Sequence, residues 1–383
     1  MQAESGTATS ILRVLHVASG DLWAGAEVAL YHLACALATN PAVKIGVVLL
    51  NEGELAQRLR NAHIQVYILD EREHGVARLL LQLDTVVRQF RPQIIHSHRA
   101  KEHLLGALAA VPRPGLISLR TVHGSAENPS GREPGVRDFI RRWLDRRIAG
   151  LQHGAIAVSA PLAADLATTL PRLPIRTIAN GINCAAIQAA AAEPCELVAP
   201  DRIGICFSGR LVPVKRVELF LAAARLVLDA CPDRYRFYVL GDGPLRGQLE
   251  AQASQLQLGG DCVFGGFLPN ALPALRRMAA LLLTSDHEGT PMVALEALAL
   301  GVPVVAHAVG GLVPLLRSAA QGQLVGSQDP REIARAILAT APPNQQPAPA
   351  RRNLLPAEYR IETCAAAHLA LYRELLGPTP ERC

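Results

Sequence analysis

One stretch in the second half of the chain reads TSDHEGTPMVALE, residues 284–296. An apolar strand ends where the stretch begins, a polar loop carries Glu288, and Thr290-Pro291 suits a helix start with Thr290 as the N-cap. Glu288 would therefore lie at the carboxyl end of a strand. Ligands of open α/β sheets bind at that edge, so the stretch predicts a binding site on a parallel sheet.

The helix of this stretch carries a second carboxylate, Glu296, among Leu295, Ala297 and Leu298. A carboxylate on an apolar face is costly unless it is hydrogen-bonded, and the paired hydroxyls of a ribose would satisfy it. The free amide of Gly289 at the helix start would face an anion. The alternative for Glu296 is a glutamate on a solvated helix edge.

The same strand, loop and helix pattern repeats along the chain on both sides of an Ala-rich segment, residues 180–201. Such alternation predicts parallel sheets covered by helices on both faces. We therefore predict an α/β protein with two Rossmann-like domains, residues 11–185 and 201–345, that face a central cleft. A final amphipathic helix is predicted over residues 357–376.

Basic residues mark the first strand end of the second domain. Gly209 allows a ligand to approach the backbone, and Arg210 and Lys215 bring two cations to one loop and helix start. A diphosphate is bound by this combination of helix amides and positive charges. The alternative is a pair of solvated surface cations. Gly241 marks a tight turn after the next strand, at the same edge, where a nucleotide base would lie.

Several motifs in the second domain occur together: Gly-Arg-Leu with a following Lys, Gly-Asp-Gly-Pro-Leu, Glu-Gly-Thr-Pro with a Glu eight residues after the first, Gly-Val-Pro-Val-Val-Ala and Gly-Gly. In order and spacing they resemble glycosyltransferase family 4, over about residues 11–376. The resemblance implies a retaining hexosyltransferase of the GT-B fold. Such an enzyme moves a sugar from a nucleotide diphosphate sugar, UDP-sugar first and GDP-mannose second, to an acceptor of a glycan or glycolipid pathway.

The resemblance also implies roles for single residues. Arg210 and Lys215 would neutralise the donor diphosphate, Glu296 would bind the ribose hydroxyls, and Glu288 would lie by the transferred sugar and assist its departure. The terminal helix would cross back onto the first domain. The donor-binding residues expected in the second domain are Gly209, Arg210, Lys215, Gly241, Glu288, Gly289, Thr290 and Glu296.

The first domain matches the family less completely. Residues 23–27 read Trp-Ala-Gly-Ala-Glu where family members usually carry Gly-Gly-x-Glu, and Gly25 is the expected donor-side glycine. His123, at a strand end, would contact the sugar near the reacting centre; the alternative is a histidine that caps the strand. His96 and His98 alternate as a metal pair would, but no Asp or Glu stands beside them on that strand to complete a zinc site. We therefore expect no metal and no cofactor.

Three rival functions remain open at this point. A GT-B-like sugar-nucleotide epimerase would need no separate acceptor, and a non-catalytic nucleotide-sugar-binding protein would keep the fold alone. A dinucleotide-dependent dehydrogenase is disfavoured, because the first strand lacks the GxGxxG spacing.

A basic helix is predicted over residues 136–147, where arginines alternate with Phe139, Ile140, Trp143 and Leu144. Three readings stay open: a solvated cationic face over a core stripe, contact with an anionic membrane or lipid acceptor, or a site for another anion. Nucleic acid is not expected, because a net charge of +5 over 383 residues is mild.

The cysteines and the first ten residues bear on the cellular compartment of the protein. The eight cysteines form no CxxC pair, and we expect them to be free thiols of a reducing compartment. Residues 1–10 have no apolar core, so we expect no signal peptide there. Together these features predict a cytoplasmic protein, with peripheral contact at the inner membrane surface under the membrane reading of the basic helix.

Overall fold

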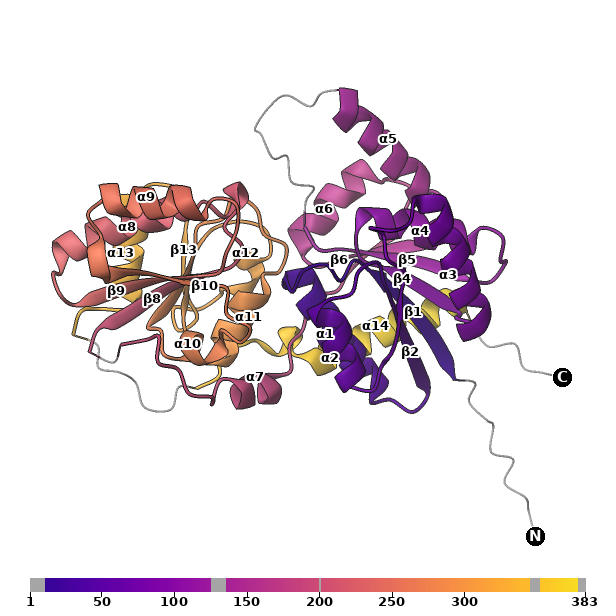
Figure 1. The fold of residues 1–383 in the computed structure, drawn as a ribbon, viewed down its shortest axis with the longest axis horizontal. Helices are drawn as coiled ribbons and strands as arrows, with labels where there is room; N and C mark the ends of the chain where they lie inside the picture. Colours follow the sequence, from indigo (N-terminus) through magenta and orange to yellow (C-terminus); the bar gives the residue numbers. More distant parts are fainter. Residues whose placement is uncertain (1–10, 125–135, 200, 345–351, 378–383) are drawn as a thin grey trace, which may run out of the picture.

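The computed structural model describes residues 11–124, 136–199, 201–344 and 352–377. Within them the chain forms two α/β domains side by side, and each is built on its own parallel sheet (Figure 1). The predicted pair of Rossmann-like domains is confirmed.

The N-terminal domain has a seven-stranded sheet covered by helices. Its strands are β1 (Leu12–Ala18), β2 (Val43–Leu49), β3 (Gln65–Ile68), β4 (Ile94–Ser97), β5 (Ile117–Val122), β6 (Gly154–Ala157) and β7 (Ile175–Thr177). Its helices are α1 (Gly25–Ala38), α2 (Glu54–Asn61), α3 (Val76–Phe90), α4 (Ala100–Ala110), α5 (Val136–Ala149), α6 (Ala160–Thr169) and α7 (Cys184–Ala190). The strand order is β3-β2-β1-β4-β5-β6-β7, and every pairing is parallel.

The C-terminal domain has a six-stranded parallel sheet in the order β10-β9-β8-β11-β12-β13. Its strands are β8 (Ile203–Ser208), β9 (Tyr235–Leu240), β10 (Cys262–Gly266), β11 (Ala280–Leu283), β12 (Val304–His307) and β13 (Gly322–Val325). Its helices are α8 (Val217–Ala230), α9 (Arg246–Gln255), α10 (Leu272–Arg276), α11 (Met292–Ala299), α12 (Leu312–Leu315) and α13 (Pro330–Thr340), with short 3-10 turns η1 (Pro213–Lys215) and η2 (Gly259–Asp261).

The central strand β11 is buried on both faces, which explains its uninterrupted apolar sequence, Ala-Leu-Leu-Leu. β4 reads Ile-Ile-His-Ser and is also buried along its whole length, and its two polar side chains are hydrogen-bonded. Parallel sheets with helices on both sides require such sequences, because neither face meets water. The sheet interiors therefore fix the positions of the strand ends, where the polar side chains lie.

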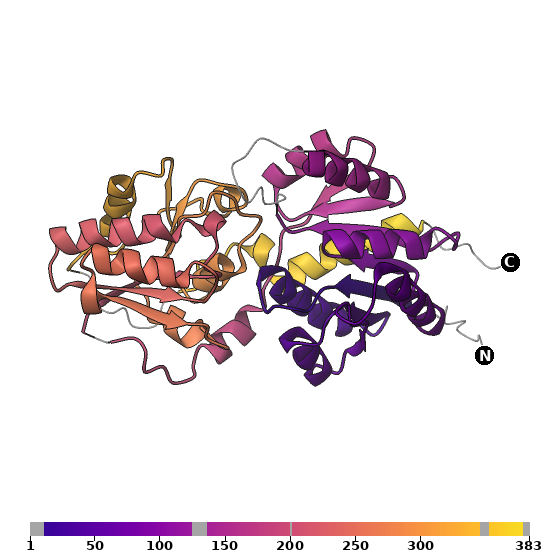
Figure 2. The ribbon, with the colours of Figure 1, turned by 45° about the horizontal axis from the view of Figure 1, so that its top comes forward.

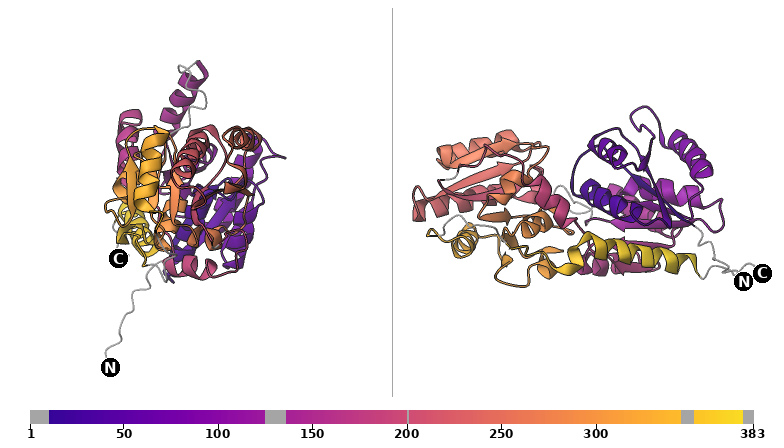
Figure 3. Two further views of the ribbon diagram at one scale, coloured as in Figure 1. Left: turned by 90° about the vertical axis from the view of Figure 1, so that its left-hand side faces the viewer. Right: turned by 90° about the horizontal axis from the view of Figure 1, so that it is seen from below.

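The last described helix lies on the N-terminal domain. After η3 (Ala357–Tyr359), helix α14 (Ile361–Leu376) runs along that domain (Figures 2 and 3), and its Cys364, Leu371 and Tyr372 are buried in the N-terminal core. The single helix predicted over residues 357–376 is thus a 3-10 turn followed by an α-helix.

Two features of the fold were not expected from the sequence. α7 lies inside the Ala-rich segment that reads as irregular, and β7 adds an edge strand to the first sheet. The predicted N-cap was wrong: α11 begins at Met292 with Pro291 as its cap, and the Thr290 hydroxyl donates to the carbonyl oxygen of Val158 at 2.6 Å. Thr290 therefore joins the two domains.

Two expectations of the sequence concern redox state and membranes. The seven cysteines among the described residues are all free. Over the same part of the chain, no helix combines the length and apolar character needed to cross a bilayer.

Candidate active site

The loop between β11 and α11 brings two predicted site residues into direct contact. The Lys215 Nζ lies 2.6 Å from Glu288 Oε1, and the Ser285 hydroxyl donates to the same oxygen at 2.7 Å. The Glu288 side chain is only 8% exposed, so the ion pair is shielded from water. This arrangement holds a cation and a carboxylate at the carboxyl edge of the sheet, as the sequence predicted for each separately.

Glu296 lies on α11, half-buried, without a hydrogen-bond or ion-pair partner among the described residues. Its neighbours Leu295 and Ala297 are fully buried. Removal of the carboxyl from water raises its pKa from 4.5 to about 7. A desolvated carboxyl without a partner is costly, and it can accept hydrogen bonds from a ligand.

Arg210 follows β8 and is exposed, and among the described residues its guanidinium forms no ion pair. It is therefore available to an anion. The loop that carries it is braced by the loop after β9: the Leu211 amide donates to the carbonyl oxygen of Asp242, and a Cβ on Gly241 would lie 2.0 Å from the Gly209 oxygen. Gly241 is therefore required for the close approach of these two loops.

The two domains meet at the Glu288 loop. A Cβ on Gly289 would lie 1.9 Å from the backbone oxygen of His123, which stands just after β5 in the N-terminal domain. The Asn180 side-chain amide donates to the Thr290 oxygen at 3.2 Å across the same boundary. Glycine at position 289 lets the domains close, and closure puts His123 beside the loop of Glu288.

His123 belongs to a row of buried histidines in the N-terminal domain. His98 Nδ1 lies 3.2 Å from His123 Nε2, and His98 Nε2 lies 3.0 Å from His16 Nδ1. Burial lowers the pKa of His16 to about 3 and that of His123 to about 4, and it lowers the pKa of His98 well below its usual value. All three rings are neutral at pH 7, so they serve as hydrogen-bonding groups and not as charges.

His16, His96 and His98 are the group within the described ranges whose nitrogens approach one another closely enough to hold a metal ion. Both His96 nitrogens have partners, the Tyr372 hydroxyl at 2.7 Å and the Thr121 hydroxyl at 2.6 Å. Both His98 nitrogens also have partners. Only His16 Nε2 is free, whereas a zinc site needs at least three protein ligands.

Gly25 begins α1 and faces the second domain, because a Cβ there would lie 3.8 Å from Met292 Cγ at the start of α11. Two residues on, Glu27 is buried and pairs with Arg99 at 2.6 Å. Burial raises the pKa of Glu27, and Arg99 opposes that shift. The segment around Gly25 is thus held in place by an ion pair within its own domain.

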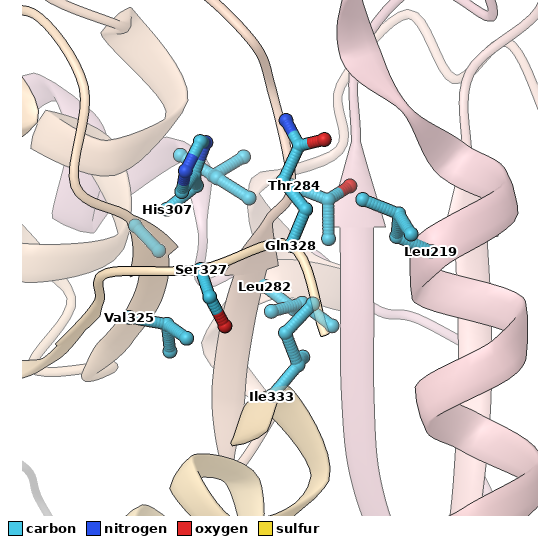
Figure 4. Close-up of a pocket in the computed structure, with 10 residues that line it drawn as sticks. Leu219, Leu282, Thr284, His307, Val325, Ser327, Gln328 and Ile333 are labelled. Atoms are coloured by element: carbon cyan, nitrogen blue, oxygen red, sulfur yellow. The ribbon is translucent and has the colours of Figure 1, made fainter. Parts of the chain in front are cut away.

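A separate pocket lies at the carboxyl ends of β11, β12 and β13 (Figure 4). Its polar lining residues are Thr284, His307, Ser327 and Gln328, beside a larger set of apolar ones. It leaves no room for a water molecule, and none of the predicted site residues lines it. We therefore place the candidate site at the domain boundary instead.

The sequence missed the residues that support the site. Ser285 braces Glu288, Asn180 holds Thr290, and His98 contacts His123. His98 had a usable signal, since it follows a strand beside the strand that His123 follows. Ser285 is three residues from Glu288 in the same polar loop, whereas Asn180 acts through a contact between segments that are distant in sequence.

Comparison with known proteins agrees with this geometry. The profile described as Glycosyltransferase Family 4 matches residues 23–186, and the profile described as Glycosyl transferases group 1 matches residues 195–341. The 2-deoxystreptamine glucosyltransferase of Streptomyces kanamyceticus is 31% identical over 62% of this chain and 64% of its own length. The D-inositol 3-phosphate glycosyltransferase of Geodermatophilus obscurus is 36% identical over 46% of this chain and 42% of its own.

The matched segments thus span less than two thirds of these relatives. Among solved structures, HepE of Anabaena in complex with UDP and glucose superposes with a TM-score of 0.77 at 18% identity, covering 94% of this chain and 99% of that one. At that identity the likeness concerns the fold, which is GT-B. The two profiles cover one domain each, and this chain belongs to glycosyltransferase family 4.

Proposed function

We propose that this protein is a glycosyltransferase that moves a sugar from a nucleotide diphosphate sugar to an acceptor, with retention of configuration. The observation that carries the proposal is the half-buried carboxyl of Glu296, which has no partner among the described residues and whose pKa is raised by burial to about 7. A ribose presents two neighbouring hydroxyls that would donate to it. Ligand binding would then repay the cost of leaving this carboxyl without a partner.

In the proposed reaction, the bond between the anomeric carbon and a diphosphate oxygen breaks, and negative charge collects on the leaving group. In the part of the chain that the structure describes, Arg210 has no competing ion pair, and Lys215 is paired with Glu288 at the carboxyl edge of the sheet. Preorganised cations stabilise such charge without a divalent metal. The acceptor then attacks on the face that the diphosphate leaves. Glu288, 2.6 Å from Lys215, would stand by the sugar ring as positive charge develops there.

A UDP-sugar is the first donor that we propose, and GDP-mannose is the second. The structurally similar Anabaena protein binds UDP, which supports this order. The acceptors named for two relatives, D-inositol 3-phosphate and 2-deoxystreptamine, are both cyclitols. Cyclitols therefore stand first among acceptors to be tried, with saccharides and glycolipids next. The named relatives favour neither an epimerase nor a non-catalytic binding protein.

A thermal-shift experiment with UDP, GDP, ADP and CMP tests the donor proposal. One nucleoside diphosphate should raise the melting temperature, and Arg210→Ala and Glu296→Ala should each lose that shift. Arg276→Ala is the matched control, since Arg276 is exposed on the same domain and has no ion pair among the described residues. If no nucleotide stabilises the protein at millimolar concentration, the proposal fails.

We also propose that this cytoplasmic enzyme touches a membrane through α5. This helix projects from the N-terminal domain (Figure 1), and Phe139 and Trp143 are 71% and 48% exposed on neighbouring turns. Ile140 and Leu144 are exposed beside them, and the Arg147 guanidinium lies over the Trp143 ring. Large apolar side chains next to cations are typical of helices that lie in an anionic membrane surface.

Tryptophan fluorescence tests this contact directly, because the chain has two tryptophans. In a Trp23→Phe variant, Trp143 is the only reporter. Its emission should shift to the blue with anionic phosphatidylglycerol vesicles and stay unchanged with neutral phosphatidylcholine vesicles. If the emission wavelength changes with neither kind of vesicle, α5 does not bind membranes and is a solvated helix.

A further inference from the structure

Three histidines from neighbouring strands form a continuous hydrogen-bonded row in the N-terminal domain. His16 lies on β1, His98 directly follows β4, and His123 directly follows β5, and these strands are adjacent in the sheet. His98 Nε2 lies 3.0 Å from His16 Nδ1, and His98 Nδ1 lies 3.2 Å from His123 Nε2. The rings of His98 and His123 are stacked, with centroids 5.5 Å apart.

The hydrogen bonds along the row all run in one direction, because each neutral imidazole carries one N–H donor and one lone-pair acceptor. His98 therefore donates to one neighbour and accepts from the other. Either all three protons are on Nδ1 and point towards His123, or all three are on Nε2 and point towards His16. The low pKa values of the three rings keep each ring neutral at pH 7.

The two ends of the row decide between these directions. His16 Nε2 and His123 Nδ1 are both buried without a partner among the described residues. Either direction leaves one buried N–H without a protein partner, on His16 Nε2 or on His123 Nδ1. His16 is fully buried, whereas His123 lines a small cavity with room for about one water, which accepts a hydrogen bond from an N–H. Buried N–H groups rarely lack an acceptor, so the favoured direction leaves the lone pair at His16 and the N–H at His123.

The residue at this end of the row lies beside the candidate site. The His123 backbone oxygen abuts Gly289 in the Glu288 loop, and His123 lines a small cavity with room for about one water. The oxygens of a diphosphate accept hydrogen bonds and do not donate them, and sugar hydroxyl oxygens also accept. An N–H at this position would serve such a ligand, whereas a lone pair would repel a phosphate oxygen.

We propose that His16 and His98 are positioning residues that fix His123 in its Nδ1–H form, so that His123 donates a hydrogen bond to the donor sugar or its diphosphate. This inference rests on the proposed function, since it assigns a use to the N–H that the row presents. The direction of the row is a property of the protein without ligand.

Nuclear magnetic resonance of the ligand-free protein labelled with ¹⁵N-histidine tests the direction. Long-range ¹H–¹⁵N correlations distinguish a protonated from an unprotonated ring nitrogen, and the signals of His123 are assigned by their loss in His123→Asn. The expected result is a proton on Nδ1 of His16, His98 and His123. Protons on Nε2 of these rings would overturn the proposal.

Variants of His98 test whether the row controls His123. His98→Leu should release the His123 proton from Nδ1 and lower kcat/KM by about tenfold, the value of one hydrogen bond. His98→Gln should restore both the Nδ1 proton of His123 and kcat/KM, because the glutamine carbonyl accepts from His16 and its amide donates to His123. His103→Leu is the control, a buried histidine whose Nδ1 lies 2.9 Å from the Ser97 hydroxyl, outside the row.

The outcomes separate the two proposals. An unchanged His123 tautomer in His98→Leu, or an equal activity loss in His103→Leu, would overturn the proposal that the row positions the His123 proton. The proposal that the protein binds UDP would be unaffected. A correct tautomer pattern in a protein that binds no nucleotide would overturn the glycosyltransferase proposal, and with it the use of the His123 N–H, while the direction of the row stands.

Discussion

The carboxyl edges of the two sheets differ in the kind of polar group that they carry. Among the described residues, the C-terminal edge has Arg210 without an ion pair, Lys215 paired with Glu288, and Glu296 without a partner. The N-terminal edge has neutral imidazoles bonded to one another, with His123 at one end of the row. Under the proposed function, the first edge would meet the charge of a diphosphate and the second would direct hydrogen bonds.

The two domains also differ in whether their charged groups are paired with one another. In the N-terminal domain the charged groups nearest the edge are paired internally, as Glu27 with Arg99 and Arg120 with Asp145. In the C-terminal domain Glu296 and Arg210 have no protein partner within the described ranges. A carboxyl that is partly removed from water without a partner is costly, so Glu296 marks the C-terminal edge as a candidate ligand-binding side.

Lys215→Ala should have the largest effect. A small effect would contradict the view that the charges of the C-terminal edge serve catalysis. The variant removes a cation from the leaving group, so kcat should fall by about 100-fold to 1000-fold. Steady-state kinetics with the donor found by thermal shift measure the loss, with Arg276→Ala expected to match the wild type. A Lys215→Ala enzyme of wild-type activity would show that this cation only holds Glu288.

Asp145→Ala should affect stability and not chemistry. Asp145 accepts from the fully buried Arg120 at 2.7 Å, so its removal leaves an uncompensated buried cation. We expect a loss of roughly 2–3 kcal/mol in the free energy of unfolding, measured by urea, with kcat unchanged at low temperature. The exposed Asp165→Ala is the control. A loss of kcat without loss of stability would place Asp145 in the site.

Glu296→Gln should make the protein more stable at high pH and weaken its binding of the nucleotide. The folded-state pKa of about 7 lies above the ordinary 4.5, so the contribution of Glu296 to stability is full below pH 4.5 and is lost as the pH rises to about 7. Glutamine never ionises, so the variant should gain stability over the wild type at pH 8, by at most a few kcal/mol since one pKa unit is about 1.4 kcal/mol. At pH 4 the gain should vanish.

Unfolding by urea at both pH values measures this difference, and the exposed Glu362→Gln serves as control. The affinity of Glu296→Gln for the nucleotide should fall about tenfold, because a neutral amide accepts more weakly than a carboxylate. Equal stability of wild type and variant at pH 8 would mean that Glu296 is solvated.

Thr290→Val should have the smallest effect. It removes the hydrogen bond to Val158 across the domain boundary at nearly constant volume, at a cost of about 1 kcal/mol. The melting temperature should drop while nucleotide affinity stays the same. Thr340→Val is the matched control, because the buried Thr340 hydroxyl has no partner among the described residues. A selective loss of nucleotide affinity in Thr290→Val would return Thr290 to the donor site.

Much of the C-terminal site could be predicted because its residues follow strand ends within short motifs. The polar loop of 284–296 comes directly after the buried β11, so the position of Glu288 follows from local sequence. Lys215 was predicted beside the same edge, but its ion pair with Glu288 joins residues 73 apart in sequence. The helix start was misplaced, because the Thr290 hydroxyl has a partner in the other domain.

By itself, the sequence determined the two α/β domains, the strand ends and the family, since hydrophobic periodicity and short motifs are local properties of the chain. Only the tertiary structure decided the row of His16, His98 and His123 and the contact of Gly289 with His123. These features depend on which strands are neighbours in the sheet and on how two domains meet, and contacts between distant segments leave no periodic signal in the sequence.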